Sequence, residues 1–194
     1  MRYGRTLLLL LLSGAVSCDS LVGPRDESEL EFVRFPADVV PLAETSAAVW
    51  AVKGQNRVLS LGYTNSSDEF MRLEIPANAL LRDANGALLQ PGDSVRITVQ
   101  LGSDRRLLFH FEPAGLQFDP AEPARLRINY SHLYGDLDGD GSIDDEDEQL
   151  ELRARIWRQE RPGDAWYPIG TMKELEADEA RSDVTSFTGF VIAA

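Results

Sequence analysis

The sequence predicts an all-β protein, an antiparallel β-sandwich with one calcium-binding loop between two strands. Three observations lead to this prediction. From Leu30 onward, apolar and polar residues alternate through most of the chain, which is the period of half-buried strands. Turn signals rich in Gly, Pro, Asn and Asp separate these runs. Strands do not alternate with helical segments, so a parallel nucleotide-binding sheet is not expected.

Roughly nine short strands are expected, as in a typical β-sandwich. The clearest run, residues 94–101, alternates over its whole length. Residues 53–56 are typical of a hairpin turn and are expected to join the strands at 48–52 and 57–63. Residues 171–179 are acidic and polar and offer the best place for a helical turn. The other expected strands are 48–52, 57–63, 70–75, 106–111, 124–130, 150–156, 166–169 and 184–192.

Residues 136–147 have the spacing of an EF-hand-type calcium loop. Gly141 permits a sharp bend at relative position 6, and Ser142 would offer its backbone carbonyl at position 7. Ile143 at position 8 would fasten the loop to the core. Carboxylates occupy positions 1, 3, 5, 9 and 12, which are Asp136, Asp138, Asp140, Asp144 and Asp147. Five carboxylates this close repel one another without a cation, so we predict a calcium site; a solvated acidic turn is the alternative.

The flanks of this loop favour strands over the helix pair of a true EF-hand. Apolar residues alternate at 126, 128 and 130 before the loop and at 150, 152, 154 and 156 after it. We therefore expect calcium to close a β-hairpin connection, although a short helical turn over 144–149 is left open. A dockerin would need a second such loop, and the chain has one. The calcium is thus expected to be structural and not to act as a sensor switch.

The first 17 residues are expected to be a signal peptide. Arg2 and Arg5 form a basic start, and residues 7–12 are an apolar run too short to span a bilayer. Small residues precede Cys18, the only cysteine. The run Ala-Val-Ser-Cys resembles the lipobox of bacterial lipoproteins, with alanine where leucine is usual, and it predicts lipidation of Cys18. Ordinary cleavage after Ser17 fits the same residues and stays open.

The predicted domain organisation follows from this leader. Residues 18–29 are short and polar and contain Gly-Pro, so they are expected to form a lipid-anchored linker. Residues 30–194 would form the sandwich domain. The expected location is outside the cytoplasm, lipid-anchored to the bacterial cell envelope on its periplasmic or surface face, with the membrane as one partner.

The charge balance excludes some partners. The formal net charge is −13, and removal of the leader leaves 17 basic and 32 acidic residues. Since no stretch is basic, nucleic acid and anionic lipid surfaces are poor partners. A strongly acidic exported domain suits calcium-rich surroundings, because cations relieve its self-repulsion.

Several motifs follow one another in a recognisable order. Residues 75–80 read Ile-Pro-Ala-Asn-Ala-Leu, and a strand over 95–99 follows. Residues 111–118 have the pattern Phe-x-Pro-x-Gly-x-x-Phe, and 123–128 form a proline-led strand. Together with the closing residues 184–193, this stretch resembles a ZU-five domain, the β-sandwich module of ankyrins, netrin receptors and many bacterial surface proteins.

The resemblance implies structural or interaction work, and we do not expect an enzyme. Some relatives cleave themselves at His-Phe-Ser near the end of the domain. The matching residues here are Ser186, Phe187 and Thr188, which lack the histidine that would accept the proton. Two histidines and one cysteine do not make a zinc site, and no Gly-x-Ser-x-Gly elbow supports a hydrolase.

The expected function is therefore a non-catalytic envelope or cell-surface lipoprotein. It would be a structural or protein-interaction module stabilised by calcium, with another envelope protein as its partner. The alternative is a glycan-binding surface module that uses exposed tryptophans. Trp50, Trp157 and Trp166 could stack on sugars, or they could pack inside the sandwich.

Overall fold

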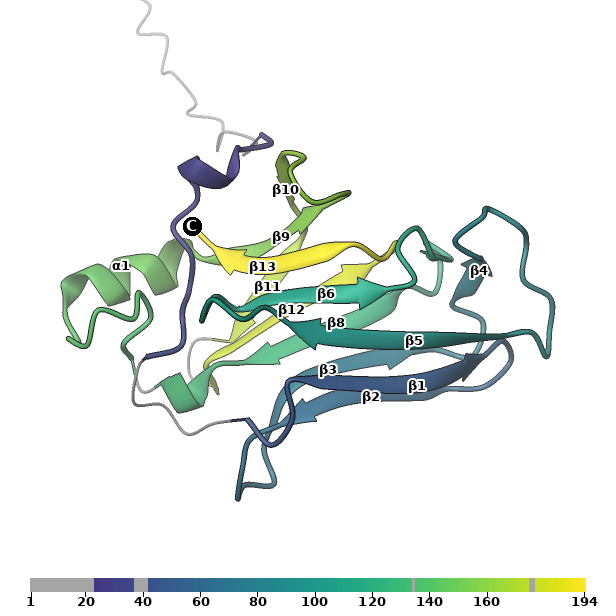
Figure 1. The fold of residues 1–194 in the computed structure, drawn as a ribbon, viewed down its shortest axis with the longest axis horizontal. Helices are drawn as coiled ribbons and strands as arrows, with labels where there is room; N and C mark the ends of the chain where they lie inside the picture. Colours follow the sequence, from purple (N-terminus) through teal and green to yellow (C-terminus); the bar gives the residue numbers. More distant parts are fainter. Residues whose placement is uncertain (1–22, 37–41, 134, 175–176) are drawn as a thin grey trace, which may run out of the picture.

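A computed structural model describes residues 23–36, 42–133, 135–174 and 177–194 (Figure 1). Two antiparallel sheets pack face to face, which confirms the predicted all-β sandwich. The larger sheet has the order β1–β5–β6–β13–β9–β10, and the smaller has the order β11–β12–β8–β3–β2; β4 and β7 form a separate short ladder. The strands are β1 (Ser46–Val52), β2 (Arg57–Gly62), β3 (Glu69–Ile75), β4 (Leu80–Arg82), β5 (Ser94–Leu101), β6 (Leu108–Glu112), β7 (Gln117–Phe118), β8 (Ala124–Asn129), β9 (Arg155–Gln159), β10 (Trp166–Pro168), β11 (Thr171–Glu174), β12 (Glu179–Val184) and β13 (Gly189–Ala193).

The core lies between the two sheets and follows the alternation of the sequence. In β8, Leu126 and Ile128 are fully buried, whereas Arg125 and Arg127 point to the solvent side. Successive side chains of a strand point to opposite faces, so one face of each strand supplies the core. Leu73 of β3 lies opposite Leu126 and is also fully buried.

The predicted hairpin at residues 53–56 is wrong. β1 pairs with β5 and β2 pairs with β3, so the turn carries the chain from one sheet to the other. The amide of Lys53 donates to the carbonyl of Asp93 (2.9 Å), and the Gly92 amide donates back to Lys53 (3.0 Å). Alternation shows that a strand has one buried face, but it does not select the neighbouring strand.

The predicted helical turn over 171–179 is also wrong in its first half. Residues Thr171–Glu174 form the edge strand β11, which pairs with β12. In β12, Ala180, Ser182 and Val184 are buried on one face, whereas Arg181 and Asp183 on the other face are not. The predicted closing strand 184–192 is divided, because β12 ends at Val184 in the smaller sheet and β13 begins at Gly189 in the larger one.

Residues 23–35, called the N-terminal strap below, lie along the larger sheet and include the 3-10 helix η1 (Glu27–Glu29). The amide of Arg25 donates to the Trp166 carbonyl (2.9 Å), and the Trp166 amide donates back (2.8 Å). Val33 donates in the same way to Ile192 (3.0 Å). The strap buries a second apolar cluster on the outer face of this sheet, made of Leu30, Phe32, Leu108, Trp157, Trp166, Val191 and Ala193.

The folded domain therefore begins by Arg25, earlier than the predicted boundary at residue 30. The predicted signal peptide, Cys18 and the first residues of the predicted linker lie outside the described residues. Within the described part of the chain, no helix is long and apolar enough to cross a bilayer.

Candidate metal site in the acidic loop

The acidic loop lies on the long connection between β8 and β9, which leaves the smaller sheet and enters the larger one. The expected β-hairpin connection is therefore wrong, since these two strands do not pair with each other. The chain passes through a second 3-10 helix, η2 (Ser131–Leu133), then the loop, then the helix α1 (Asp145–Arg153). The loop bridges the two sheets at one end of the sandwich (Figure 1).

Helix α1 replaces the first part of the strand predicted over 150–156. The Asp144 side chain caps it by accepting from the Glu146 amide (2.9 Å), and its first turn carries four acidic residues, which favour the positive end of the helix dipole. Leu150 and Ala154 are buried four residues apart, as on one helical face, while Leu152 is exposed. The open alternative, a helical turn over 144–149, lies within this helix except at its cap.

Three of the predicted ligands come together. One carboxylate oxygen each from Asp136, Asp138 and Asp147 lie within 4.8 Å of one another. Asp136 and Asp147 are only 7% and 4% exposed. Buried carboxylates are unfavourable unless paired or bound to a cation. This cluster could hold a metal ion.

Backbone amides hold these buried carboxylates in place. Asp147 Oδ1 accepts from the amides of Leu137 (2.7 Å) and Asp138 (3.3 Å), and its Oδ2 accepts from Asp144 (3.0 Å). Asp136 Oδ1 accepts from the Gly139 amide (2.8 Å). Within the described residues, no Lys, Arg or His side chain forms an ion pair with a loop carboxylate. The loop thus orients oxygen atoms without neutralising their charge.

The other three predicted ligands are exposed. Asp140 Oδ1 accepts from the Ser142 amide (2.7 Å), and the Asp144 side chain caps α1. Gly141 has a φ of +96°, the left-handed bend predicted for it. Ligation by Asp140, Ser142 and Asp144 stays a prediction.

The pKa of Asp138 is raised in the loop, where several carboxylates lie close together. The hydrogen bond from the Asp140 amide lowers this pKa, but partial burial and the carboxylates of Asp140, Asp147 and Asp136 together raise it by more. The net pKa of Asp138 therefore lies above its usual value. A divalent cation would reverse this balance, because it favours the ionised form of each carboxylate.

The predicted apolar anchor of the loop is wrong. Ile143 is 71% exposed, whereas Leu137 is 4% exposed. The Leu137 carbonyl accepts from the Arg34 amide of the strap (2.8 Å). Gly139, with a φ of +77°, passes so close to the strap that an added Cβ would lie 3.1 Å from the Arg34 Cβ. Leu137 belongs to the main hydrophobic core, and its amide donates to Asp147 Oδ1 (2.7 Å).

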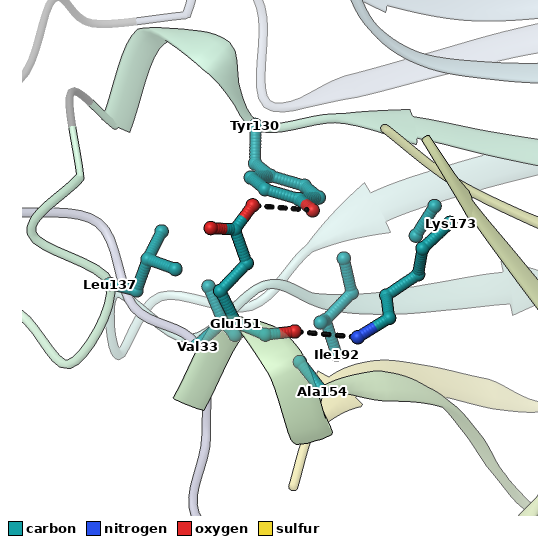
Figure 2. A pocket seen from close by; sticks show the side chains of 8 residues that line it. Val33, Tyr130, Leu137, Glu151, Ala154, Lys173 and Ile192 are labelled. Carbon is teal, nitrogen blue, oxygen red and sulfur yellow. Dashed lines mark hydrogen bonds between the residues drawn. The ribbon is translucent and has the colours of Figure 1, made fainter. Parts of the chain in front are cut away.

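A small cavity of about 10 Å³ lies beneath the loop (Figure 2). The Tyr130 hydroxyl donates to Glu151 Oε1 (3.1 Å), and burial raises the Tyr130 pKa above its usual value. Lys173 Nζ donates to the last carbonyls of α1, those of Glu151 and Leu152 (both 2.6 Å). The volume suits at most one water molecule. The cavity is therefore a small packing gap where the loop, helix α1 and the strap meet, and not a ligand pocket. It is lined by Val33, Tyr130, Leu137, Glu151, Ala154, Lys173, Ala180 and Ile192.

The tryptophans divide into two groups. Trp157 and Trp166 are buried under the strap, and Trp157 Nε1 donates to the Ala193 carbonyl (2.8 Å). The suggestion that they could serve as sugar platforms is therefore wrong. Trp50, on the edge strand β1, is 59% exposed.

The segment that matches the self-cleavage motif lies beside β6, where His110 pairs with Gly189, the residue after Thr188. Ser186 Oγ accepts from Arg158 Nη1 (2.7 Å), and Phe187 is fully buried against Phe111 and Phe118. His132 lies elsewhere, with its Nε2 3.0 Å from Asp68 Oδ2.

The sequence alone did not predict the burial of Leu137 or the backbone contact between Leu137 and Arg34 of the strap. It also did not predict the hydrogen bonds that join Tyr130 and Lys173 to Glu151. A leucine between two inward carboxylates was the one available signal, because the other contacts join residues far apart in the chain. Comparison of the chain with protein-family models, curated proteins and solved structures found no match.

Proposed function

We propose that this chain is a non-catalytic, exported lipoprotein module whose acidic loop binds calcium as a structural cross-link. The observation that supports it best is the cluster of the buried Asp136 and Asp147 with the half-buried Asp138, which gathers negative charge without an ion pair to any cationic side chain of the described residues. A bound cation would stabilise the connection between the two sheets.

Calcium is the proposed ion because the available ligands are all oxygens on a bent loop. Hard cations prefer carboxylates and carbonyls, and calcium accepts six to eight of them in irregular geometry, whereas magnesium demands a near-ideal octahedron. The exposed carboxylates of Asp140 and Asp144 could complete the coordination. We expect an affinity on the order of 10⁻⁴ to 10⁻³ M or somewhat tighter, as in extracellular modules.

The leader supports the exported, lipid-anchored part of the proposal. A basic start, a short apolar run and small residues precede Cys18, and a thioether-linked lipid would account for an unpaired cysteine in an exported chain. Incorporation of labelled palmitate into the wild type, but not into Cys18→Ser, is the expected result. The likeness of residues 73–130 and 184–193 to ZU-five domains favours another envelope protein as the partner.

Thermal unfolding tests the calcium site. The Cys18→Ser chain without its leader should melt roughly 2–8 °C higher in millimolar calcium than in EDTA, since a ligand that binds only the folded state stabilises it. Magnesium should give a smaller shift. A melting curve that EDTA leaves unchanged would show that the loop is only an acidic turn.

A second candidate function rests on Trp50. Its exposed ring lies opposite Arg96 on the neighbouring strand β5, and an exposed indole beside a guanidinium could stack on a sugar ring. Glycan-array binding that disappears in Trp50→Ala, with an unchanged melting temperature, would favour a glycan-binding module. Co-purification of one envelope protein with both the wild type and Trp50→Ala would favour the first proposal.

A further inference from the structure

We infer that the β10 edge of the sandwich faces the lipid bilayer, and that the β1 edge points away from it. This inference rests on the proposed lipidation of Cys18. It follows from where the strap leaves the fold and how short the remaining chain is.

The strap fixes the exit point of the chain. Arg25 exchanges two backbone hydrogen bonds with Trp166, the first residue of β10 (2.9 and 2.8 Å), and its guanidinium lies 5.6 Å from the ring centroid of Trp157. β10 is the edge strand of the larger sheet. The chain before Arg25 therefore starts from this edge, which lies beside η1 in Figure 1.

The chain between the lipid and the fold is short. Five peptide steps separate Cys18 from Gly23, and they span at most about 18 Å when fully extended. Residues 25–35 cannot lengthen this tether while they are docked, because their backbone bonds join the strap to β10 and β13. A lipid on Cys18 would thus hold the β10 edge close to the bilayer surface.

The β10 edge carries an exposed aromatic side chain that suits a lipid surface, although its charges do not favour anionic headgroups. The arginines 25, 158 and 161 lie near the acidic residues 26, 27, 29, 160 and 164, so this edge carries a formal excess of two negative charges. Tyr167 of β10 is exposed, and tyrosine is favoured at membrane–water interfaces.

The opposite edge would then be the one presented to a partner. β1 and β10 are the two ends of a six-stranded sheet, so at a spacing of about 4.8 Å they lie roughly 24 Å apart. Trp50 is on β1 and is largely exposed. The orientation therefore places Trp50 on the membrane-distal edge of this sheet and Tyr167 on the membrane-facing edge.

Energy transfer from single fluorophores tests the orientation. Cys18 is the only cysteine and would carry the lipid, so one introduced cysteine can be labelled alone. Arg161→Cys lies in the β9–β10 turn and Asn56→Cys in the β1–β2 turn, and both positions are exposed. The full-length lipoprotein would be reconstituted in vesicles of phosphatidylethanolamine and phosphatidylglycerol with acceptor-labelled headgroups. We expect transfer from position 161 to exceed that from position 56 several-fold.

A longer tether is the matched control. Insertion of about 20 Gly/Ser residues after Ser20 should bring the two transfer efficiencies close together, since such a linker allows a separation of about 25 Å. Equal transfer from both positions in the short-tether protein would overturn the orientation but not the lipidation. Failure of the protein to float with the vesicles would overturn both.

Discussion

Carboxylates are concentrated in two places in this molecule, and they are stabilised differently. On the outer face of the smaller sheet, Arg72 bonds Glu69 (2.9 Å) and Glu74 (2.8 Å), and the charges alternate across neighbouring strands. We call this set the arginine–glutamate ladder; it comprises Glu69, Arg72, Glu74, Arg127, Glu174, Glu179 and Arg181. In the acidic loop, backbone amides replace the arginines.

The pKa values differ in direction for this reason. The hydrogen bond from Arg72 lowers the pKa of Glu74, burial opposes it, and the charges of nearby arginines lower the pKa further. The pKa of Asp138 is raised, because neighbouring carboxylates and burial outweigh the amide bond that lowers it. Amides orient a carboxylate but leave its charge, so the loop could hold a cation, whereas arginines already neutralise the ladder.

The largest expected effect tests whether the loop, unlike the ladder, is part of the core. Leu137→Ala should lower the free energy of unfolding by about 3 kcal/mol, because it empties a buried site beside the cavity. Ile143→Ala should change it by less than about 0.5 kcal/mol, since Ile143 is exposed. Urea unfolding of both variants measures the difference, and equal losses would contradict the assignment of Leu137 as the anchor.

Substitutions of Asp147 should have the next largest effect. They distinguish its role as a hydrogen-bond acceptor for the loop amides from its role as a charged metal ligand. Asp147→Ala leaves the amides of Leu137, Asp138 and Asp144 without an acceptor, and should cost about 2–3 kcal/mol in EDTA. Asp147→Asn keeps one acceptor oxygen and should cost less. Both variants should lose the calcium-dependent rise in melting temperature. A full calcium response in Asp147→Asn would rule out Asp147 as a ligand.

A smaller effect is expected in the ladder. Arg127→Gln breaks the contacts to Glu69 (2.8 Å) and Glu179 (3.4 Å), but the side chains are partly exposed, so the loss should be about 1 kcal/mol or less. High salt should reduce this loss, and calcium should leave it unchanged. Melting curves at low and high salt, with and without calcium, provide the measurement.

The smallest effects should have opposite signs in the two places. At neutral pH in EDTA, Asp138→Asn should raise the melting temperature by on the order of a degree and Glu74→Gln should lower it by a similar amount. The contribution of Asp138 to the free energy of unfolding is most favourable below the pKa that this residue has in the unfolded chain. It is lost as the pH rises through the raised pKa of the folded protein. The contribution of Glu74 to the free energy of unfolding is present above the pKa that this residue has in the unfolded chain. It is lost as the pH falls through the lowered pKa of the folded protein. Melting-temperature shifts of the same sign in the two variants would contradict this difference between the acidic loop and the ladder.

The sequence by itself determined the all-β class, most strand positions and the residues of the acidic cluster. Residues 94–101 were predicted as a strand at the bounds that β5 has, because alternation reflects one buried face and needs no knowledge of the neighbours. The spacing of Asp136, Asp138 and Asp147 was also readable, since a bent loop brings these residues together through local geometry alone.

Only the tertiary structure decided which strands pair, where the loop attaches and where the domain begins. Alternation at residues 150–156 suited a strand, but the Asp144 cap and the burial of Leu150 made a helix. Leu137, not Ile143, became the anchor because it packs between strap, helix and sheet. The strap itself looked like a polar linker, yet Arg25 binds Trp166 far along the chain. Contacts between distant segments decide these features, and no local pattern encodes them.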